Sequence, residues 1–295
     1  MQNFNYHAPD SLAQARALMA EDPAHSCYLA GGTDLYLALE HRLRDVYTVI
    51  DLKRIAALHG VDGGPGAGKG GAWRIGALTS MAEIERHAAL QRQFPALCAA
   101  AAVVGGPPVR NRATLGGNLC NASPAADTAT PLLALGATLT VAQGKRERSL
   151  PLAGLWRGPR QTTLPPGAVL TAIALPAQPP RSGNAFQRIT RTAMDIAVVN
   201  AAACVVLDEA GRAQSVIVAL GAVAPTVMMV PGLDKALAGR ALDDAALDTV
   251  RARAQAAARP IDDVRGTAAY RAEMAGVLAA RAVRAAAAMA AGGAR

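Results

Sequence analysis

Cysteine is scarce in this sequence of 295 residues. The four cysteines, Cys27, Cys98, Cys120 and Cys204, lie far apart and form no C-x-x-C pair. Such spacing excludes a zinc knuckle, a ferredoxin-type run of cluster ligands and a scaffold held by many disulfides. Scattered cysteines without a framework fit a reducing compartment, so we expect a cytoplasmic protein.

Aromatic residues are also few, at 3% of the chain. The 30 Lys and Arg residues exceed the 22 Asp and Glu residues and give a net charge of +8, but they are spread along the sequence. Nucleic-acid binding requires clustered cations and stacking platforms and is therefore disfavoured, whereas a positive surface suits an anionic cofactor or an acidic partner. The five histidines form no pair at a spacing that suits a metal ion, so we expect no metal site.

Long apolar runs are missing as well. The longest uncharged stretch, Ala213 to Leu233, is interrupted by Gly221, Pro225 and Pro231. It therefore predicts a buried strand and a loop rather than a membrane helix. The first residues show no basic segment followed by an apolar core, so we expect no signal peptide and no membrane span.

Apolar residues make up 52% of the chain, enough for a sizeable core, and the length suggests two domains of about 150 residues each or three small ones. Their periodicity predicts strands at 27–30, 46–52, 73–77, 137–142 and 168–175, and helices from 12, from 34 to 43, at 92–104 and at 128–135. The best linker is 178–183. Beyond it, strands are expected at 185–189, 198–207 and 216–222, then helices at 243–257 and 267–290.

Some local signals are more specific. Asp34 is a candidate N-cap, and Ser80 with Glu83 forms a capping box at the start of another helix. The stretch 109–127 is rich in Gly and Asn and is expected to be irregular. In the last helix, Tyr270, Met274, Val277 and Leu278 share a face and are expected to pack on a sheet.

The first motif with chemical meaning is Ala30-Gly31-Gly32-Thr33-Asp34-Leu35, where a strand leads through two glycines into a helix. Glycine lets the backbone approach a ligand closely. Consecutive N–H groups bind anions, and a helix N-terminus adds positive potential. An ordinary strand–turn–helix corner explains this motif equally well when it is considered alone.

The second motif runs from Arg110 to Asp127 and contains two arginines, three asparagines, a glycine pair and few residues able to form a core. A stretch of this kind inside a compact domain is usually functional, although a plain surface loop is the alternative. Gly116 and Gly117 are expected to present N–H donors to a phosphate. Asn118, Ser123 and Asp127 are expected to bind sugar or polyol hydroxyls.

Together the two motifs suggest a long ligand with a central diphosphate, held by two loops of one domain. The site is not of the Rossmann type, because no G-x-G-x-x-G follows the first strand and no parallel βαβαβ series is predicted. The run Gly63 to Gly70 is close to a Walker A loop. We reject that match, because Gly70 stands where a Mg²⁺-binding hydroxyl is needed and no helix pattern follows.

The order of the motifs carries a resemblance. Ala30-Gly31-Gly32-Thr33-Asp34-Leu35, followed by Thr114-x-Gly116-Gly117-Asn118 and Ser123-Pro124-x-x-Asp127, resembles the FAD-binding (medium) subunit of the molybdenum hydroxylases. That family includes xanthine dehydrogenase, carbon monoxide dehydrogenase and aldehyde oxidoreductases. The resemblance continues through 156–162, 191–200 and 260–271, so it covers nearly the whole chain. The two glycine loops in this order are specific to the family, and the C-terminal stretches are supporting evidence for the resemblance.

The resemblance implies an α+β fold. A vanillyl-alcohol-oxidase/PCMH-type FAD-binding domain of two subdomains would occupy 1–177. A smaller domain of antiparallel sheet plus helices, like the C-terminal domain of the CO dehydrogenase flavoprotein, would occupy 183–290. FAD is the implied cofactor. The implied FAD-binding residues are Leu29, Ala30, Gly31, Gly32, Thr33, Asp34, Leu35, Thr114, Gly116, Gly117, Asn118, Ser123, Asp127, Leu170, Phe186 and Arg188.

Within that set, the resemblance gives several residues a role. Both glycine loops would hold the diphosphate, Asp127 would lie on the polyol side, and Leu170 would pack near the flavin. The strand with Phe186, Gln187 and Arg188 would lie beside the isoalloxazine. Relatives often place Lys near this point, and Arg188 is the closest cation here. An arginine beside the ring would stabilise reduced, anionic flavin.

The implied function is electron transfer within an assembly. A large subunit with a molybdenum cofactor would hydroxylate an aldehyde, an N-heterocycle, a purine or a CO-type substrate. Electrons would pass through two [2Fe–2S] clusters of a small subunit to FAD on this chain, and then to NAD⁺, oxygen or a quinone. A dimer of heterotrimers is one arrangement that the family suggests. Because no cluster motif is present here, the electrons would have to come from a partner.

Two other functions compete with this interpretation. A stand-alone FAD-dependent reductase or oxidase would need its own substrate pocket and catalytic acid, and the sequence shows no clear candidate for either. A non-enzymatic anion-binding or docking subunit would need no flavin. Cys120 lies inside the second motif and lacks the three further clustered cysteines that a [4Fe–4S] insertion would need, so we expect a small buried residue.

Overall fold

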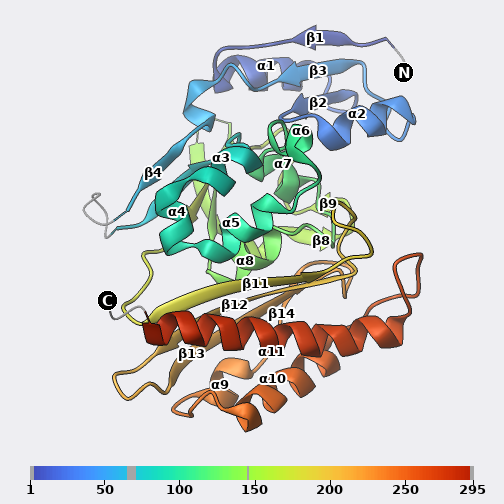
Figure 1. Cartoon of the computed structure of the whole chain (residues 1–295). Coiled ribbons are helices and arrows are strands. Elements are labelled where there is room, and N and C mark those ends of the chain that lie inside the picture. The colour runs from blue at the N-terminus through green and yellow to red at the C-terminus, as the bar shows by residue number, and fades with distance from the viewer. Residues whose placement is uncertain (1–2, 65–70, 145, 293–295) are drawn as a thin grey trace.

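The computed structural model describes residues 3–64, 71–144 and 146–292. Figure 1 shows three units stacked on one another, with the N-terminal unit at the top of the view and the C-terminal sheet and helices at the bottom. Lys145 and most of the run 63–70 that resembles a Walker A loop lie outside the described residues.

The N-terminal unit is a small parallel sheet with a helix on each face. Its strands are β1 (Asn5–His7), β2 (Ser26–Leu29) and β3 (Thr48–Asp51), in the order β1-β3-β2, and its helices are α1 (Leu12–Glu21) and α2 (Thr33–Glu40). Ala15 and Met19 of α1 pack with Ile50, whereas Leu39 of α2 packs with Val49. Because the strands are parallel, the segments that follow β2 and β3 emerge at the same edge of the sheet.

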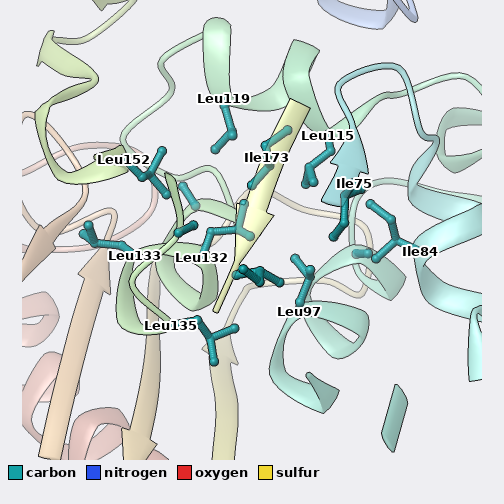
Figure 2. Close-up of a cluster of buried hydrophobic side chains, with 14 of the residues drawn as sticks. Ile75, Ile84, Leu97, Leu115, Leu119, Leu132, Leu133, Leu135, Leu152 and Ile173 are labelled. Carbon is teal, nitrogen blue, oxygen red and sulfur yellow. The ribbon is translucent and has the colours of Figure 1, made fainter. Parts of the chain in front are cut away.

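The middle unit is a five-stranded antiparallel sheet covered by short helices. The strands are β4 (Val61–Gly63), β5 (Trp73–Gly76), β10 (Val169–Leu175), β6 (Thr138–Gln143) and β7 (Arg146–Pro151), in that spatial order. The helices are α3 (Met81–Arg86), α4 (Ala88–Gln93), α5 (Pro95–Ala102), α6 (Pro107–Arg110), α7 (Leu115–Cys120) and α8 (Ala129–Ala134). A small hairpin, β8 (Trp156–Gly158) and β9 (Gln161–Thr162), lies beside them. Leu115, Leu119, Leu132 and Ile173 meet in the core of this unit (Figure 2).

The C-terminal unit is an antiparallel sheet with helices on one face. It contains β11 (Ser182–Ile189), β12 (Val199–Leu207), β13 (Ala213–Gly221) and β14 (Met228–Met229), with α9 (Leu233–Leu237), α10 (Asp244–Ala257) and α11 (Ala268–Gly292). Along β12, Ala202 contributes to the core of the middle unit, whereas Ala201 and Ala203 pack with the C-terminal helices. This period of two places one face of the sheet against the middle unit.

The longest helix departs from the prediction. Ala275, Ala279, Ala282, Ala286 and Ala290 of α11 are buried, while Tyr270 is 42% exposed. A Cβ at Gly183 of β11 would stand only 2.1 Å from the carbonyl oxygen of Ala286. The helix backbone therefore lies too close to the sheet at this point for large side chains. Of the predicted face, Leu278 is buried and Met274 packs half-buried against the same core, whereas the prediction was wrong for Tyr270.

Helix α11 is also long and apolar enough to cross a membrane by length and composition, and it is the one such helix in the described residues. It runs along β11 and β12 in Figure 1, with its alanine face buried against them. A core helix of this kind passes the same test as a membrane span, so its composition alone carries little weight.

Other local predictions hold in part. The capping box of Ser80 and Glu83 is confirmed at the start of α3. The predicted helix 92–104 is divided, because Pro95 lacks an N–H and begins a new helix, α5. The prediction of an irregular stretch at 109–127 was wrong in two places, since α6 extends to Arg110 and Thr114 caps a short helix, α7.

Candidate functional site

The first glycine motif forms a turn at the edge where the parallel strands end. Gly32, not the predicted Asp34, is the N-cap of α2, and it has φ +82°, a left-handed conformation that glycine adopts without strain. No side chain caps this helix end. The first N–H groups of a helix have no partner within the helix, so the start of α2 leaves donors for an anion.

The two glycine motifs meet in space. A Cβ at Gly31 would lie 2.0 Å from the carbonyl oxygen of Arg112, so only glycine permits this approach. A Cβ at Gly117 would lie 3.7 Å from Cβ of Ala30. The structure thus brings together two loops that lie about 80 residues apart in the sequence, as a shared ligand site requires.

The second glycine pair has a different role from the one predicted. The N–H of Gly116 donates to the carbonyl oxygen of Ala77 at 2.8 Å, and the N–H of Gly117 donates to Oγ1 of Thr114 at 3.1 Å. The expectation that these N–H groups are offered to a phosphate was therefore wrong. A Cβ at Gly116 would stand 2.7 Å from Cβ of Ala77, so this glycine serves close packing.

A cavity of about 430 Å³ opens beside the first loop. The loop contributes Leu29, Gly31, Gly32, Thr33 and Leu35, and most of the rest of the wall is apolar. The other lining residues are Phe4, Tyr6, Tyr36, Leu39, Val49, Lys53 and Arg112. A largely apolar wall that also contains Lys53 and Arg112 suits a ligand that combines a flat ring with a negative group.

A polar network lies under this loop and was not predicted. Nζ of Lys53 stands 2.6 Å from Oδ2 of Asp51 and donates to the carbonyl oxygen of Ala30 at 3.3 Å. The hydroxyl of Tyr6 donates to the same Asp51 oxygen at 2.5 Å. Burial acts to raise the pKa of Asp51, but hydrogen bonds from Lys53 and Tyr6 outweigh it and hold the pKa below its ordinary value.

The polar side chains expected near a polyol lie along and after α7. Oγ1 of Thr128 donates to Oδ1 of Asn118 at 2.7 Å, and Oγ of Ser123 accepts from the N–H of Ala125 at 3.3 Å. The hydroxyl of Ser123 and the amide N–H₂ of Asn118 keep donor capacity beyond these bonds.

Asp127 lies at the junction of the two domains rather than in a free loop. Its carboxylate accepts from Nη1 of Arg188 at 2.7 Å and from Nδ2 of Asn200 at 2.9 Å. Burial raises the pKa of Asp127 to about 6, while the charge of Arg188 and the hydrogen bonds from Asn200 and Arg188 oppose the rise. At neutral pH the pair is therefore charged.

Arg188 is equally engaged. Its guanidinium also donates to the carbonyl oxygens of Val103 at 2.7 Å and Asp195 at 2.6 Å. Only 8% of its side chain is exposed. This cation therefore joins the middle unit to the loop between β11 and β12. Asn200 of β12 completes this network. No role was predicted for this residue, because nothing in its neighbouring sequence distinguishes it.

The two predicted apolar contacts lie in or against the core of the middle unit. Leu170 of β10 is buried, and Phe186 of β11 is half-buried against the same core. The prediction that Cys120 is buried was wrong. This residue is exposed at the end of α7, and Leu115 and Leu119 lie on the buried face of the helix. The protein surrounding its sulfur still raises the pKa of the Cys120 thiol to about 12.

Within the described residues, no group of three or more His, Cys, Asp or Glu side chains is placed to hold a metal ion. The chemistry of the site therefore consists of an uncapped helix end, two touching glycine loops, an apolar cavity and cations at its rim. These features are typical of a protein with a site for an anionic ligand that carries a ring, on a fold other than the Rossmann fold.

Comparison with known proteins identifies the class further. Residues 2–178 match the family described as the FAD binding domain in molybdopterin dehydrogenase, and residues 184–286 match the CO dehydrogenase flavoprotein C-terminal domain. The chain is 37% identical over 224 residues to a xanthine dehydrogenase FAD-binding subunit of Escherichia coli O157:H7, covering 75% of each protein. It is 33% identical to the carbon monoxide dehydrogenase medium chain of Afipia carboxidovorans, covering 95% of this chain and 96% of that one.

The fold agrees with these sequence matches. A carbon monoxide dehydrogenase structure from Hydrogenophaga pseudoflava superimposes with a TM-score of 0.92 at 30% identity, covering 97% of this chain and 98% of that one. The chain therefore belongs to the FAD-binding subunits of the molybdenum hydroxylase family. It is an oxidoreductase subunit with the two-domain architecture that its motifs predicted.

Proposed function

We propose that this chain is the electron-transfer subunit of a heteromeric molybdenum hydroxylase. Its FAD takes electrons from the [2Fe–2S] clusters of a small partner subunit and passes them to an external acceptor such as NAD⁺, oxygen or a quinone. The observation that carries the proposal is the contact of two glycine loops beside the uncapped start of α2. When bound, FAD supplies the redox chemistry, since it exchanges electrons singly or in pairs.

The residues of the first loop fit the diphosphate of FAD. Gly31 and Gly32 leave the space, α2 supplies N–H donors, and Thr33 and Leu35 line the adjoining cavity. Leu29, Ala30 and Asp34 complete this segment. The second loop acts by shape: Thr114 accepts from Gly117, Gly116 packs against Ala77, and Gly117 lies beside Ala30 of the first loop.

The remaining site residues are assigned to the polyol and the flavin ring. Asn118, Ser123 and Asp127 would bind ribityl hydroxyls, and Leu170 and Phe186 would pack near the ring. Arg188 would place a positive charge beside the ring while Asp127 holds its guanidinium at 2.7 Å. Arg188→Ala is then expected to shift the flavin potential, and an unchanged potential in a folded, flavin-loaded variant would refute this role.

The partners follow from what the chain lacks. All four cysteines are free, which supports a reducing, cytoplasmic location, and none of their positions suits an iron–sulfur cluster. Relatives bear names such as nicotine 6-hydroxylase medium subunit and caffeine dehydrogenase subunit beta, which mark them as parts of larger enzymes. A large molybdenum subunit would hydroxylate the aldehyde, N-heterocycle, purine or CO-type substrate, and a dimer of heterotrimers is the proposed assembly.

Purification of the native complex tests the proposal. We expect flavin absorbance in this chain and co-purification of two partners that carry molybdenum and iron, identified by native mass spectrometry. A colourless chain that binds no added FAD would refute the flavin assignment. A yellow chain that oxidises or reduces a substrate alone, without partners, would instead favour the stand-alone reductase or oxidase.

A further inference from the structure

Two cations line the cavity beside the first glycine loop, and within the described residues only one of them has an anionic partner. Lys53, which follows β3, and Arg112, which precedes α7, both line it together with Gly31 and Gly32. Arg112 is exposed, and no hydrogen bond or ion pair engages its guanidinium within the described residues. The charges of Arg54 and Arg112 are close enough to act on the pKa of Tyr6, in the direction opposite to Asp51.

Lys53 is held in a fixed position by a buried group. Asp51 is only 4% exposed, and its carboxylate bonds both the ammonium of Lys53 at 2.6 Å and the hydroxyl of Tyr6 at 2.5 Å. The carbonyl oxygen of Ala30 takes a second ammonium hydrogen at 3.3 Å, which places the charge at the start of the glycine turn. An ammonium has three donors, so one is left for a ligand.

The two cations come from different segments of the chain that meet at the turn. Lys53 comes from the parallel sheet, and Arg112 comes from the second loop, whose carbonyl at the same residue touches Gly31. The start of α2, at Gly32 and Thr33, lines the same cavity. A diphosphate carries two negative charges, so two flanking cations match it, and the apolar wall offers space for an attached aromatic ring.

We propose that Lys53 and Arg112 are the side-chain cations that bind the diphosphate of FAD, and that Asp51 is the positioning residue for Lys53. This assignment rests on the proposed function and adds residues that neither glycine motif contains. It separates two tasks: the glycines make room for the diphosphate, and the two cations neutralise it. The competing explanation is that Lys53 serves only its ion pair with Asp51 and that Arg112 is a solvated surface residue.

The test is cofactor affinity in the full-length chain freed of flavin. FAD and ADP are titrated at several salt concentrations, with flavin fluorescence and ligand displacement as the measurements. Lys53→Met and Arg112→Met are each expected to weaken both ligands about tenfold, because charge-assisted bonds to phosphate are lost. Both variants should also show a flatter dependence of affinity on salt, since screening acts on the charges removed.

Three controls keep the test decisive. Arg44→Met removes an exposed cation of the same unit that does not line the cavity, and it should leave affinity unchanged. Lys53→Arg retains the charge and should retain most of the affinity. Arg112→Met loses no partner within the described residues, so its fold, checked by circular dichroism, is expected to survive even where Lys53→Met is unstable.

The outcomes separate the two proposals. If the wild-type chain and all variants bind FAD equally and with the same salt dependence, the roles of Lys53 and Arg112 are refuted and the proposed function stands. If the wild-type chain itself binds neither FAD nor ADP, the proposed function fails, and this inference fails with it.

Discussion

Two junctions in this molecule join distant segments, and they are built in opposite ways. The junction of the glycine loops is made of main chain, with Gly31 against the carbonyl of Arg112. The junction of the domains is made of buried charged and polar side chains, with Asp127 between Arg188 and Asn200. The main-chain junction leaves no room for an added atom. At the side-chain junction, removal of one side chain leaves its buried partner without that hydrogen bond or ion pair.

The difference teaches how each junction fails. An added methyl group at the main-chain junction produces a steric clash that backbone atoms cannot avoid by rotating. Removing one charge at the side-chain junction leaves the opposite charge buried and unpaired in the protein interior, which solvates ions poorly. The main-chain junction therefore depends on volume, and the side-chain junction depends on charge and pH.

The largest expected effect comes from breaking the ion pair. Arg188→Met leaves the Asp127 carboxylate buried without its cation and removes the donor to Val103 and Asp195. We expect a loss of about 3–5 kcal/mol in the free energy of unfolding, measured by denaturant titration. Adding Asp127→Asn should recover part of this loss, because the stranded charge is then gone. A double variant less stable than Arg188→Met would contradict this account.

The second effect is a pH dependence that belongs to the side-chain junction. The pKa of Asp127 is about 6 in the folded chain against 3.8 for an ordinary carboxyl group. Between these values the folded state keeps a proton that the unfolded state has lost, so the unfolding free energy falls as pH rises from about 4 to 6. The expected fall is at most about 3 kcal/mol.

Thermal or urea unfolding of the flavin-free chain across this pH range checks the dependence. Asp127→Asn provides the comparison, because it lacks the titrating group and should show a smaller fall. Equal pH profiles for the two proteins would show that Asp127 does not titrate in this window.

The third effect belongs to the main-chain junction. Gly31→Ala places a Cβ 2.0 Å from the Arg112 carbonyl oxygen and is expected to cost about 1–3 kcal/mol of stability and to reduce FAD affinity. The matched control is Gly154→Ala, since a Cβ at Gly154 meets nothing within 4 Å. Calorimetry of both variants measures the difference, and similar melting temperatures would show that the loops can separate without cost.

The smallest effect is the loss of a helix cap at the same junction. Thr114→Ala removes the oxygen that accepts the N–H of Gly117 at 3.1 Å and should cost about 1 kcal/mol. Thr114→Ser keeps the oxygen and should cost less. A destabilisation as large in the serine variant would assign the effect to the lost methyl group instead.

Predictions from sequence succeeded where the signal was local. The double glycine after a strand and the Ser80–Glu83 capping box each act within a few residues, and the structure confirms a turn and a capped helix there. The order of the two glycine motifs also identified the family, which the comparisons confirm. Motifs of this kind require particular residue types at fixed short spacings, so they can be recognised in one sequence.

Predictions failed where a third segment intervened. Asp34 is a good cap by type, but the left-handed Gly32 is the N-cap of α2, two residues earlier. Gly116 and Gly117 suit a phosphate loop, but Ala77 and Thr114 take their N–H groups. Tyr270 of α11 suits a sheet, but it stays exposed, and the close approach of Gly183 to Ala286 leaves room for alanines at that point.

The sequence by itself determined the class of this protein, because close backbone approach requires glycine and a row of glycines can be seen without a structure. It did not determine which charges meet. Asp127 pairs with Arg188 across 61 positions and with Asn200 across 73, and Lys53 and Arg112 come together only when the two loops touch. Long-range pairing of side chains depends on sheet register and on the packing of whole units, which only the tertiary structure decides.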